Sequence, residues 1–509
     1  MMGTRQNNTT ALHSVSSGKM STGKKSGRKK AVDLVFLIII TALIYPAYTG
    51  WQELYQNFLE KDEPTIKVQE IPAGIGSNPL KMRIDVADVG AGIDEVIVRS
   101  EQDGEIKELE RVSYKLKKNE DAVFVNIDGR EEGFREGEVK IRVLAFDRSL
   151  WSNKSLFELD LTVDYTPPRL AAITTQHNVV VGGVGLVFYR LDEKQDSFSG
   201  VKVGQEFFPG FLASRLDEDY KERPDVYFSF FAIPLEFDVD RDRIELFATD
   251  GVGNVASGSM YYRVQERKYG SRVVELSEAF LRNSIERIIK DYAILRDKLK
   301  ITTLDGVSLA TTPKGLVEQF RLINEDYRQK IETLAEPLFA RPRASRLWTG
   351  VFSRLSGSAS QSPFGEERMY RFGELDAGSS LHIGEDLASY ANTSVRAANS
   401  GKVVFADRLG LYGSAIILDH GFGLYTLYAH LSDISAREGD SVNKGDVIGK
   451  TGNSGFAEGD HLHFEMRLHG VPVRPLEWWD ARWIQEHIDD TITNTKKALG
   501  LKVVTRIEP

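Results

Sequence analysis

Residues 461–465 read His-Leu-His-Phe-Glu, and this short stretch carries the strongest structural signal in the chain. In a β-strand, side chains alternate between the two faces, so His461 and His463 point to the same side. Two imidazoles on one face suit a metal ion that keeps a position open for a reactive water. The stretch therefore predicts a strand that carries part of a catalytic metal site.

Further candidate ligands lie upstream of this strand. His382 and Asp386 are four residues apart and offer a neutral nitrogen and a carboxylate, and His430 follows in the segment 428–431. A catalytic zinc site uses three protein ligands and leaves one position for water. Taken singly, each histidine is more often a surface or core residue than a ligand. Five such residues within one glycine-rich β segment favour a shared metal site.

The remaining histidines have no other candidate ligands near them in the sequence. We expect them to be ordinary solvent-facing residues, namely His13, His177, His469 and His487. His420 lies near the candidate ligands and is expected to be structural. The chain has no cysteine, which excludes disulfides and thiolate ligands, so a zinc ion would be held by nitrogen and oxygen.

The region from about 363 to 475 resembles the lysostaphin-type, or LytM, zinc endopeptidases, which cut peptide bonds in peptidoglycan. The motifs that carry the resemblance are Phe364 to Arg368, His382 to Asp386, Tyr428 to Leu431, Gly439 to Gly449 and Gly459 to Glu465. The resemblance implies a zinc ion held by His382, Asp386 and His463. It also implies that His461 is the general base and that His430 stabilises the oxyanion of the tetrahedral intermediate.

Two residues depart from the usual family pattern. Glu385 stands where many relatives carry an aliphatic residue, and Asp460 precedes His461 where proline is frequent. Neither change removes a ligand. A carboxylate beside His461 could fix its tautomer or raise its pKa, and the sequence leaves both readings open.

Length and charge limit the remaining possibilities. At 509 residues the chain is long enough for three or four domains. The formal net charge of -9, without any basic aromatic stripe, argues against nucleic-acid binding. The overall expectation is a multidomain, mainly β protein with an antiparallel zinc peptidase domain over 362–480. The resemblance implies for that domain the open sandwich shared with biotinyl and lipoyl carriers.

The amino terminus predicts a membrane anchor. Residues 31–50 are mostly apolar and approach the length that spans a bilayer. Basic residues precede this segment and acidic residues follow it, so the positive-inside rule leaves a cytoplasmic tail at 1–30 and the bulk of the chain outside, in a periplasm or extracytoplasmic space. A cleavable signal peptide is the competing interpretation, but 46–49 make a poor cleavage site. We expect a single-pass protein of the cytoplasmic (inner) membrane.

Two β-rich units are expected between the anchor and the peptidase, at 64–166 and 167–265. A weak repeat supports them, because Asp147 and Asn153 recur as Asp250 and Asn254 at the separation of one immunoglobulin-like sandwich. Pro167-Pro168 marks the boundary between the units. One larger β domain is the alternative.

A helical hairpin is predicted at 272–339. Apolar residues recur there at helical spacing, and Thr312-Pro313 predicts the cap and first residue of the second helix. The hairpin could pack on the peptidase, or it could be an arm that docks a protein partner or covers the cleft. A flexible linker is expected at 340–361. The tail at 481–509 is expected to be helical and to dock on the catalytic domain.

Two functions are consistent with these features. The first is a membrane-anchored zinc endopeptidase that hydrolyses stem peptides or cross-links of peptidoglycan during cell-wall remodelling. The second is a non-enzymatic peptidoglycan-binding activator or scaffold for another wall hydrolase. The helical H-E-x-x-H pattern of common protein-cleaving zinc proteases is absent. Because all five site residues are present, the sequence favours the enzyme.

Overall fold

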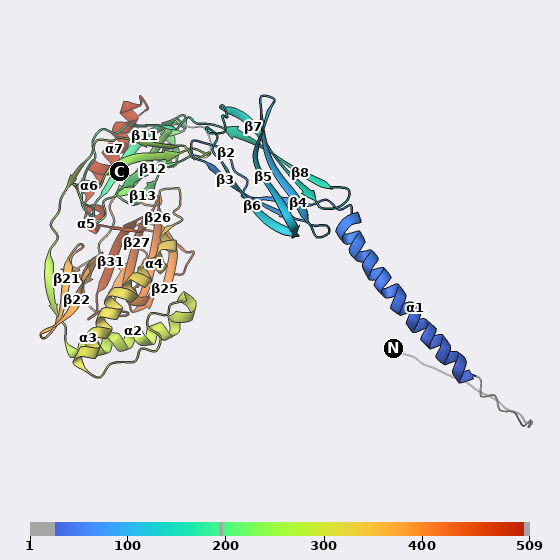
Figure 1. The fold of residues 1–509 in the computed structure, drawn as a ribbon. Helices are drawn as coiled ribbons and strands as arrows, with labels where there is room; N and C mark the ends of the chain where they lie inside the picture. Colours follow the sequence, from blue (N-terminus) through green and yellow to red (C-terminus); the bar gives the residue numbers. More distant parts are fainter. Residues whose placement is uncertain (1–25, 193–196, 503–509) are drawn as a thin grey trace, which may run out of the picture. The chain divides into compact units, whose positions relative to one another are not determined.

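The computed structural model describes residues 26–192 and 197–502 (Figure 1). The chain divides into two compact units. The first comprises Met1–Pro72 and Pro79–Val163, and the second comprises Ala73–Asn78 and Asp164–Pro509. The second β region, the helices and the predicted peptidase domain therefore form one compact body.

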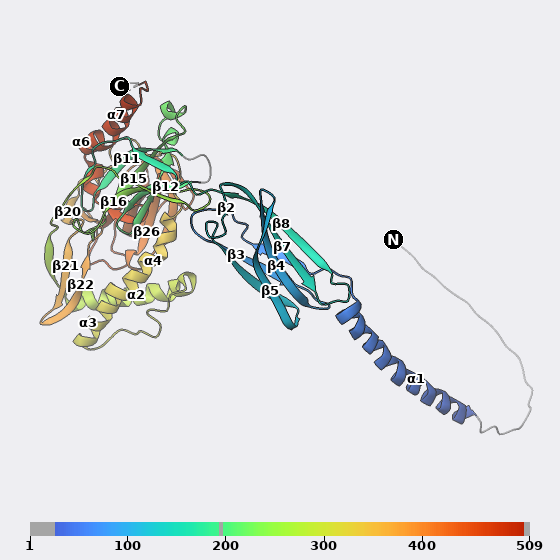
Figure 2. The same cartoon turned by 45° about the horizontal axis from the view of Figure 1, so that its top comes forward.

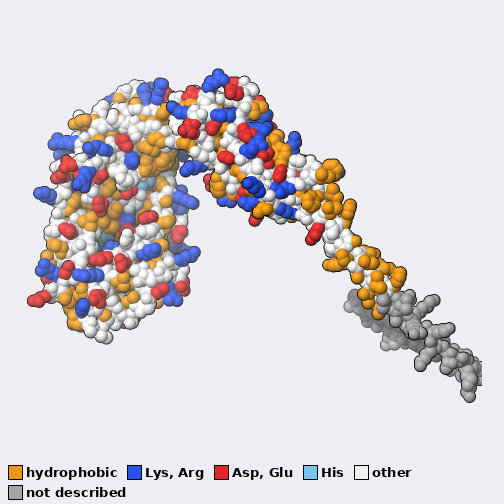
Figure 3. Space-filling view, in the orientation of Figure 1, with side chains coloured by type: hydrophobic (Ala, Val, Ile, Leu, Met, Phe, Trp, Pro, Cys, Tyr) orange, Lys and Arg blue, Asp and Glu red, His pale blue; other side chains and the backbone are white. Residues whose placement is uncertain are grey.

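The first unit begins with helix α1, Ser26–Leu54, which continues as a π-helical turn, Tyr55–Leu59. Its apolar side chains at Leu34 and from Phe36 to Tyr48 are exposed, and Figure 3 shows apolar side chains along the helix. Within the described residues, no helix reaches the length and apolar character needed to cross a membrane. The membrane span at 31–50 stays a prediction, and most of the predicted cytoplasmic tail lies outside the described residues.

Seven antiparallel strands complete the first unit. They are β1 Thr65–Gln69, β3 Leu80–Ala87, β4 Ile93–Gln102, β5 Glu105–Lys118, β6 Glu120–Ile127, β7 Gly137–Asp147 and β8 Lys154–Val163. One sheet has the order β1-β3-β6 and the other includes β8-β7-β4-β5. In β3 and β7 every second side chain is buried, as expected when two sheets pack face to face. The sandwich architecture is present, whereas its likeness to an immunoglobulin domain stays a prediction.

The second unit opens with another pair of four-stranded antiparallel sheets, ordered β14-β15-β11-β9 and β13-β12-β16-β17. The strands are β9 Arg169–Ala172, β11 Val184–Asp192, β12 Phe198–Val203, β13 Glu206–Pro209, β14 Phe211–Leu212, β15 Val226–Ala232, β16 Ile244–Thr249 and β17 Val255–Gly258. Short strands β10 Asn178–Val180 and β18 Arg263–Gln265 pair in parallel.

The repeated Asp and Asn residues make the same local structure in both β regions. The Asp147 carboxylate accepts hydrogen bonds from the backbone and side-chain amides of Asn153, both at 2.8 Å. Asp250 accepts the equivalent pair from Asn254, at 2.8 and 2.7 Å. In each case a buried carboxylate closes the turn after a strand, which explains why the sequence repeat survives in two otherwise different segments.

The helical segment forms two arms. Helix α2, Glu278–Leu299, is one arm, and α3 Pro313–Leu322, a π-helical turn Ile323–Tyr327 and α4 Arg328–Phe339 form the other. Thr312 caps α3 by accepting a hydrogen bond from the Gly315 amide, with Pro313 at the first position, as predicted. The helices begin at 278, because Ser271–Glu275 is a strand, β19, that pairs in parallel with β21, Glu367–Phe372.

The C-terminal region is built on one large sheet with the path β20-β23-β31-β27-β26-β25-β29. These strands are β20 Ala359–Ser362, β23 Glu385–Ala388, β31 Leu462–Leu468, β27 Leu424–Leu431, β26 Ser414–Gly421, β25 Gly401–Arg408 and β29 Ser441–Val442, and β32 Val471–Val473 pairs with β31. A smaller sheet contains β24 Ser394–Arg396, β30 Val447–Lys450 and β28 Asp433–Ile434, and β21 forms a hairpin with β22 Leu375–Leu381.

Both faces of the large sheet are covered, and β26 and β27 are therefore buried at nearly every position. Ile416, Leu418 and Tyr428 belong to a core shared with the preceding β sandwich. Ile417 and Leu427 point the other way, into a core with α2, α3 and α4. In Figures 1 and 2 the helices lie across this second face. The hairpin therefore packs on the peptidase domain, as the first of the two sequence interpretations proposes.

The segment 340–361 is not a flexible linker. Trp348 and Phe352 are almost fully buried, and the Phe352 amide donates to the Trp478 carbonyl at 2.9 Å. Arg346 lies over the Trp348 ring, 3.8 Å from its centroid. The small and polar residues suggested a linker, but these two aromatic side chains anchor the segment in the core.

The C-terminal helices pack differently from the prediction. They are α5 Pro475–Trp479, α6 Ala481–Ile484, a π-helical turn Gln485–Asp489 and α7 Asp490–Ala498. Tyr220 donates to the Ile492 carbonyl at 3.1 Å, and Lys496 forms ion pairs with Asp217 and Asp219. The tail therefore docks largely on the β sandwich before the catalytic domain, through partners that lie far away in sequence.

Candidate metal centre

Three side chains converge on one point at the end of the large sheet. His463 in β31 lies opposite Asp386 in β23, and His382 follows β22 directly. The Asp386 Oδ1 atom is 3.1 Å from His382 Nε2 and 2.8 Å from His463 Nδ1, and the two nitrogens are 3.2 Å apart. All three residues are buried and close enough to bind one metal ion together. These are the three ligands predicted from the sequence.

The second nitrogen of each imidazole is held by an acceptor. His382 Nδ1 donates to the Pro363 carbonyl at 2.9 Å, and His463 Nε2 donates to Glu465 Oε1 at 2.8 Å. In these neutral tautomers His382 Nε2 and His463 Nδ1 carry lone pairs, which face each other and the Asp386 oxygen. Three converging lone pairs without a proton repel one another unless a cation lies between them. This nitrogen and oxygen donor set, oriented by outer partners, fits zinc.

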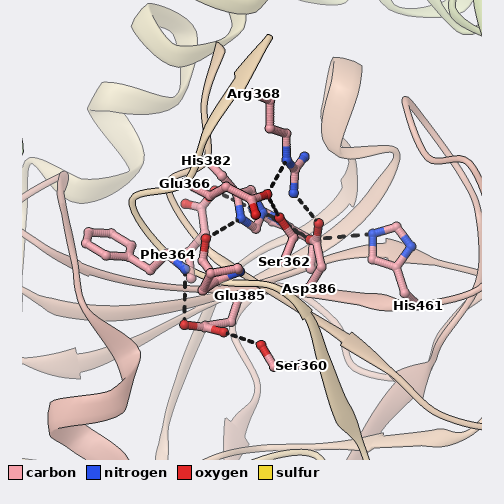
Figure 4. Close-up of polar contacts among 12 residues, drawn as sticks. Ser360, Ser362, Phe364, Glu366, Arg368, His382, Glu385, Asp386 and His461 are labelled. Atoms are coloured by element: carbon pink, nitrogen blue, oxygen red, sulfur yellow. Dashed lines mark hydrogen bonds and ion pairs between the residues drawn. The ribbon is translucent and has the colours of Figure 1, made fainter. Parts of the chain in front are cut away.

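The second oxygen of Asp386 is also held in place. Arg368 donates to Asp386 Oδ2 at 2.6 Å and lies 3.5 Å from the Glu366 carboxylate (Figure 4). Asp386 is therefore a carboxylate at neutral pH, as a metal ligand must be.

His461 and His430 lie beside the three ligands, with ring centroids 4.9 Å apart. His461 Nδ1 donates to the Gly459 carbonyl at 2.8 Å, and its Nε2 is 3.5 Å from Asp386 Oδ1. His430 Nδ1 donates to the Ser454 carbonyl at 2.9 Å. In both rings the Nε2 atom is thereby left as a proton acceptor. This tautomer suits a general base at His461.

The backbone at His430 is unusual, because its φ is +59° in a strand that is otherwise extended. Such left-handed geometry is costly for a branched or bulky residue and is often found at functional sites. Burial, together with His461 and His463, lowers the pKa of His430 well below its usual value. A neutral His430 that donates through Nδ1 must first take up a proton before Nε2 can donate to an oxyanion.

The departures from the family pattern do not touch His461. Asp460 Oδ2 accepts from the Asn392 amide at 3.1 Å, and Glu385 accepts from the Phe364 amide and the Ser360 hydroxyl at 3.1 and 3.0 Å. Figure 4 shows Glu385 turned toward Phe364 and Ser360, away from His461. Both carboxylates thus bind neighbouring loops rather than tuning the predicted base.

The other histidines divide into two groups. His420 is fully buried between the Ser400 carbonyl and Thr426, which confirms a structural role. The prediction that His177 faces solvent is wrong, because it is buried beside Phe231. His469 is half-buried, with its ring against Phe208. His487 is half-buried and stacks on Trp483. His13 lies outside the described residues.

Four residues that sequence reasoning did not assign complete the surroundings of His463. Glu465 and Arg467 follow it in β31, and Tyr412 and Glu332 join them. Strand periodicity carries a signal for the first two, because residues 461, 463, 465 and 467 all point to one face. Tyr412 and Glu332 come from distant segments and have no such signal.

A cavity of about 370 Å³ opens in front of the metal centre. His382, His430 and His461 line one side, and the helices contribute Phe320 and Glu332 to the other. The helices thus form one wall of this cavity.

Two imidazoles and a carboxylate around one point, with two further imidazoles beside them, are a donor set that suits a metal ion and an activated water. Comparison with known families agrees, because residues 380–475 match the model of Peptidase family M23. Residues 380–475, in the C-terminal part of the second unit, form an M23 peptidase domain.

Three similar proteins illustrate the relationship. DD-carboxypeptidase/endopeptidase Mpg of Neisseria meningitidis is 43% identical over 126 residues, which are 25% of this chain and 27% of Mpg. Stage II sporulation protein Q of Bacillus subtilis is 40% identical over 105 residues, 20% of this chain and 37% of that protein. The catalytic domain of lysostaphin from Staphylococcus simulans matches at 29% identity and a TM-score of 0.21, over 25% of this chain and 94% of that structure. The chain spans only 27% of the length of Mpg and 37% of the length of stage II sporulation protein Q.

Proposed function

We propose that this protein is a zinc endopeptidase that hydrolyses peptide bonds in peptidoglycan. The observation that supports the proposal most strongly is the convergence of His382 Nε2, Asp386 Oδ1 and His463 Nδ1, with both imidazoles oriented by outer hydrogen bonds. The matched family and the peptidase names of relatives such as Mpg support the same reaction class.

The residues around the metal centre support separate catalytic roles for His461 and His430. A zinc ion bound there would acidify water and polarise the scissile carbonyl. His461, with its Nε2 unprotonated, takes the proton from the attacking water. His430 Nε2 faces the same cavity, and once it has taken a proton from solvent it donates a hydrogen bond to the developing oxyanion or delivers that proton to the leaving amine.

Membrane attachment through 31–50 is part of the proposal. It is supported by the run of exposed apolar side chains on α1 and by the basic residues before and acidic residues after this segment. Attachment to the inner membrane would hold the catalytic unit beside the wall in the periplasm. Cell fractionation, combined with protease treatment of intact spheroplasts, tests this topology. Recovery of the protein in the soluble fraction would contradict it.

Purified sacculi provide the test of the activity. The full-length protein in detergent is incubated with sacculi, with zinc or with a chelator, and released fragments are identified by mass spectrometry. His461→Ala is the inactive variant and His487→Ala, on the half-buried stack with Trp483, is the matched control. We expect zinc-dependent peptide products from the wild type and the control only.

The alternative of a peptidoglycan-binding activator makes a different prediction in this assay. Stage II sporulation protein Q, whose name states no peptidase activity, shares the domain and keeps this alternative relevant. Binding to sacculi without any released peptide, by zinc-loaded protein, would favour the activator and contradict the proposed hydrolysis.

A further inference from the structure

The helices reach the metal centre through a buried chain of polar contacts. His463 Nε2 donates to Glu465 Oε1 at 2.8 Å, and Glu465 Oε2 accepts from Arg467 Nε at 2.6 Å. Arg467 Nη2 in turn donates to Glu332 Oε2 at 2.9 Å. Glu332 belongs to α4, outside the residues that match the M23 family. A candidate zinc ligand is thus linked to a helix by three successive contacts.

Tyr412 closes this chain into a ring. Its hydroxyl lies 2.6 Å from Glu332 Oε1 and 2.8 Å from Glu465 Oε1, and it accepts from Arg467 Nη2 at 2.8 Å. A phenol has a single proton to donate. With Glu332 in place, that proton goes to the nearer carboxylate, and Glu465 Oε1 stays available to accept from His463.

The charges in the ring depend on Glu332 as well. Glu465 is fully buried and Arg467 is 4% exposed, so their charges need partners within the protein. Arg467 is shared between the Glu465 and Glu332 carboxylates. Without the charge of Glu332, Arg467 and the Tyr412 hydroxyl would both direct their hydrogen bonds to Glu465. Glu465 would then hold the His463 imidazole less firmly.

The other arm of the helices also contacts the site. Arg287 on α2 donates to the carbonyls of Asn453 and Ala457, the second at 3.0 Å. Phe456, in the same loop, packs against Phe280 and Phe320. This loop contains Ser454, whose carbonyl fixes His430. Both arms therefore support residues of the site from outside the family domain.

We propose that Glu332 is a positioning residue of the metal centre, acting through Arg467, Tyr412 and Glu465 to orient His463 for metal binding. The helical segment is then a component of the site as well as a wall of its cleft. The inference rests on the zinc site of the proposed function, but it concerns metal binding and needs no peptidase activity. Outer partners of metal-ligating histidines typically contribute about 10-fold to 100-fold in metal affinity.

The test measures zinc affinity of the full-length protein by competition with a fluorescent chelator. Glu332→Gln keeps the shape of the side chain and removes its charge. Glu336→Gln, on the exposed side of the same helix, is the matched control. We expect zinc to bind about 10-fold more weakly to Glu332→Gln and unchanged to Glu336→Gln. The absorption spectrum of the cobalt-loaded protein should also change for Glu332→Gln alone, since the orientation of His463 alters the ligand field.

Unchanged zinc affinity and an unchanged cobalt spectrum in Glu332→Gln would overturn the proposal. A lower melting temperature with wild-type zinc affinity would overturn it too, because Glu332 would then support only the fold. A wild type that binds zinc but releases no peptides would refute the proposed peptidase and leave this inference standing. A wild type that binds no zinc would refute both.

Discussion

Glu477 offers a test of whether the M23 domain and the preceding β sandwich form one body, because its buried carboxylate joins them. It lies in α5, is 6% exposed, and accepts a hydrogen bond from the Val184 amide of β11 at 3.1 Å. Burial raises the pKa of Glu477 from 4.5 to about 7, against the lowering effects of this hydrogen bond and of Arg474 and Arg267. Replacing Glu477 with glutamine should stabilise the protein at alkaline pH.

The sign follows from proton binding. Between pH 4.5 and 7 the folded state holds a proton on Glu477 that the unfolded state has lost, so the free energy of unfolding falls as pH rises. At about 1.4 kcal/mol per pKa unit, the loss amounts to about 3 kcal/mol above pH 7. Glutamine carries no charge at any pH and keeps an oxygen for the Val184 amide. Glu477→Gln should therefore be about 3 kcal/mol more stable than wild type at pH 8 and nearly equal at pH 4.

Urea unfolding followed by tryptophan fluorescence measures this difference, because Trp348 and Trp478 are buried in the same unit. Glu438→Gln, at an exposed position of the catalytic domain, is the control and should follow the wild type at every pH. A variant Glu477→Gln with the same dependence of stability on pH as the wild type would refute the reasoning. It would mean that Glu477 faces water and that the contact with β11 does not persist in solution.

Three further predictions concern the helices and the site. Ile331→Ala should lower the free energy of unfolding of the second unit by about 3 kcal/mol, because Ile331 is fully buried against Gly410. If urea unfolding shows that this free energy changes by less than about 0.5 kcal/mol, the helices are a detachable arm. His430→Asn should lower kcat about 100-fold and leave the zinc content unchanged, because asparagine tolerates the left-handed backbone but cannot transfer a proton. An unchanged kcat on a muropeptide dimer would remove His430 from the mechanism. Chelation should lower the free energy of unfolding of the second unit by about 4 kcal/mol, relative to protein in free zinc at about 1,000 times its Kd, and should leave the first unit unchanged. Calorimetry measures both transitions. Equal shifts in the melting temperatures of both units would contradict the assigned site.

The candidate metal ligands could be predicted because they lie in local motifs. His461 and His463 share a strand face by period alone, and His382 and Asp386 meet them because β23 pairs with β31. The cap at Thr312 and the apolar face of the helices could also be predicted from the sequence, because both depend on residues close in sequence. Such features require no knowledge of distant contacts.

Features that depend on distant contacts were missed. The polar, glycine-containing composition of 340–361 predicts a linker. Trp348 and Phe352 are instead buried by residues far along the chain, which the local composition does not reveal. His469 is half-buried against Phe208 and Phe211, which come from the preceding sandwich. Glu332 is separated from Arg467 by 135 residues, and helical periodicity places it only on the margin of an apolar face. Sequence pattern alone specifies neither the partners nor the direction of such side chains.

Hydrolysis of a purified cross-linked muropeptide dimer in ¹⁸O-labelled water tests the central claim most directly. The account predicts that the zinc-loaded wild type releases monomers with one ¹⁸O atom in a new carboxyl group, and that Asp386→Ala releases none. Mass spectrometry would identify the bond from the labelled fragment. An intact dimer after incubation with zinc-loaded wild type, or equal cleavage by Asp386→Ala, would contradict a zinc peptidase centred on His382, Asp386 and His463.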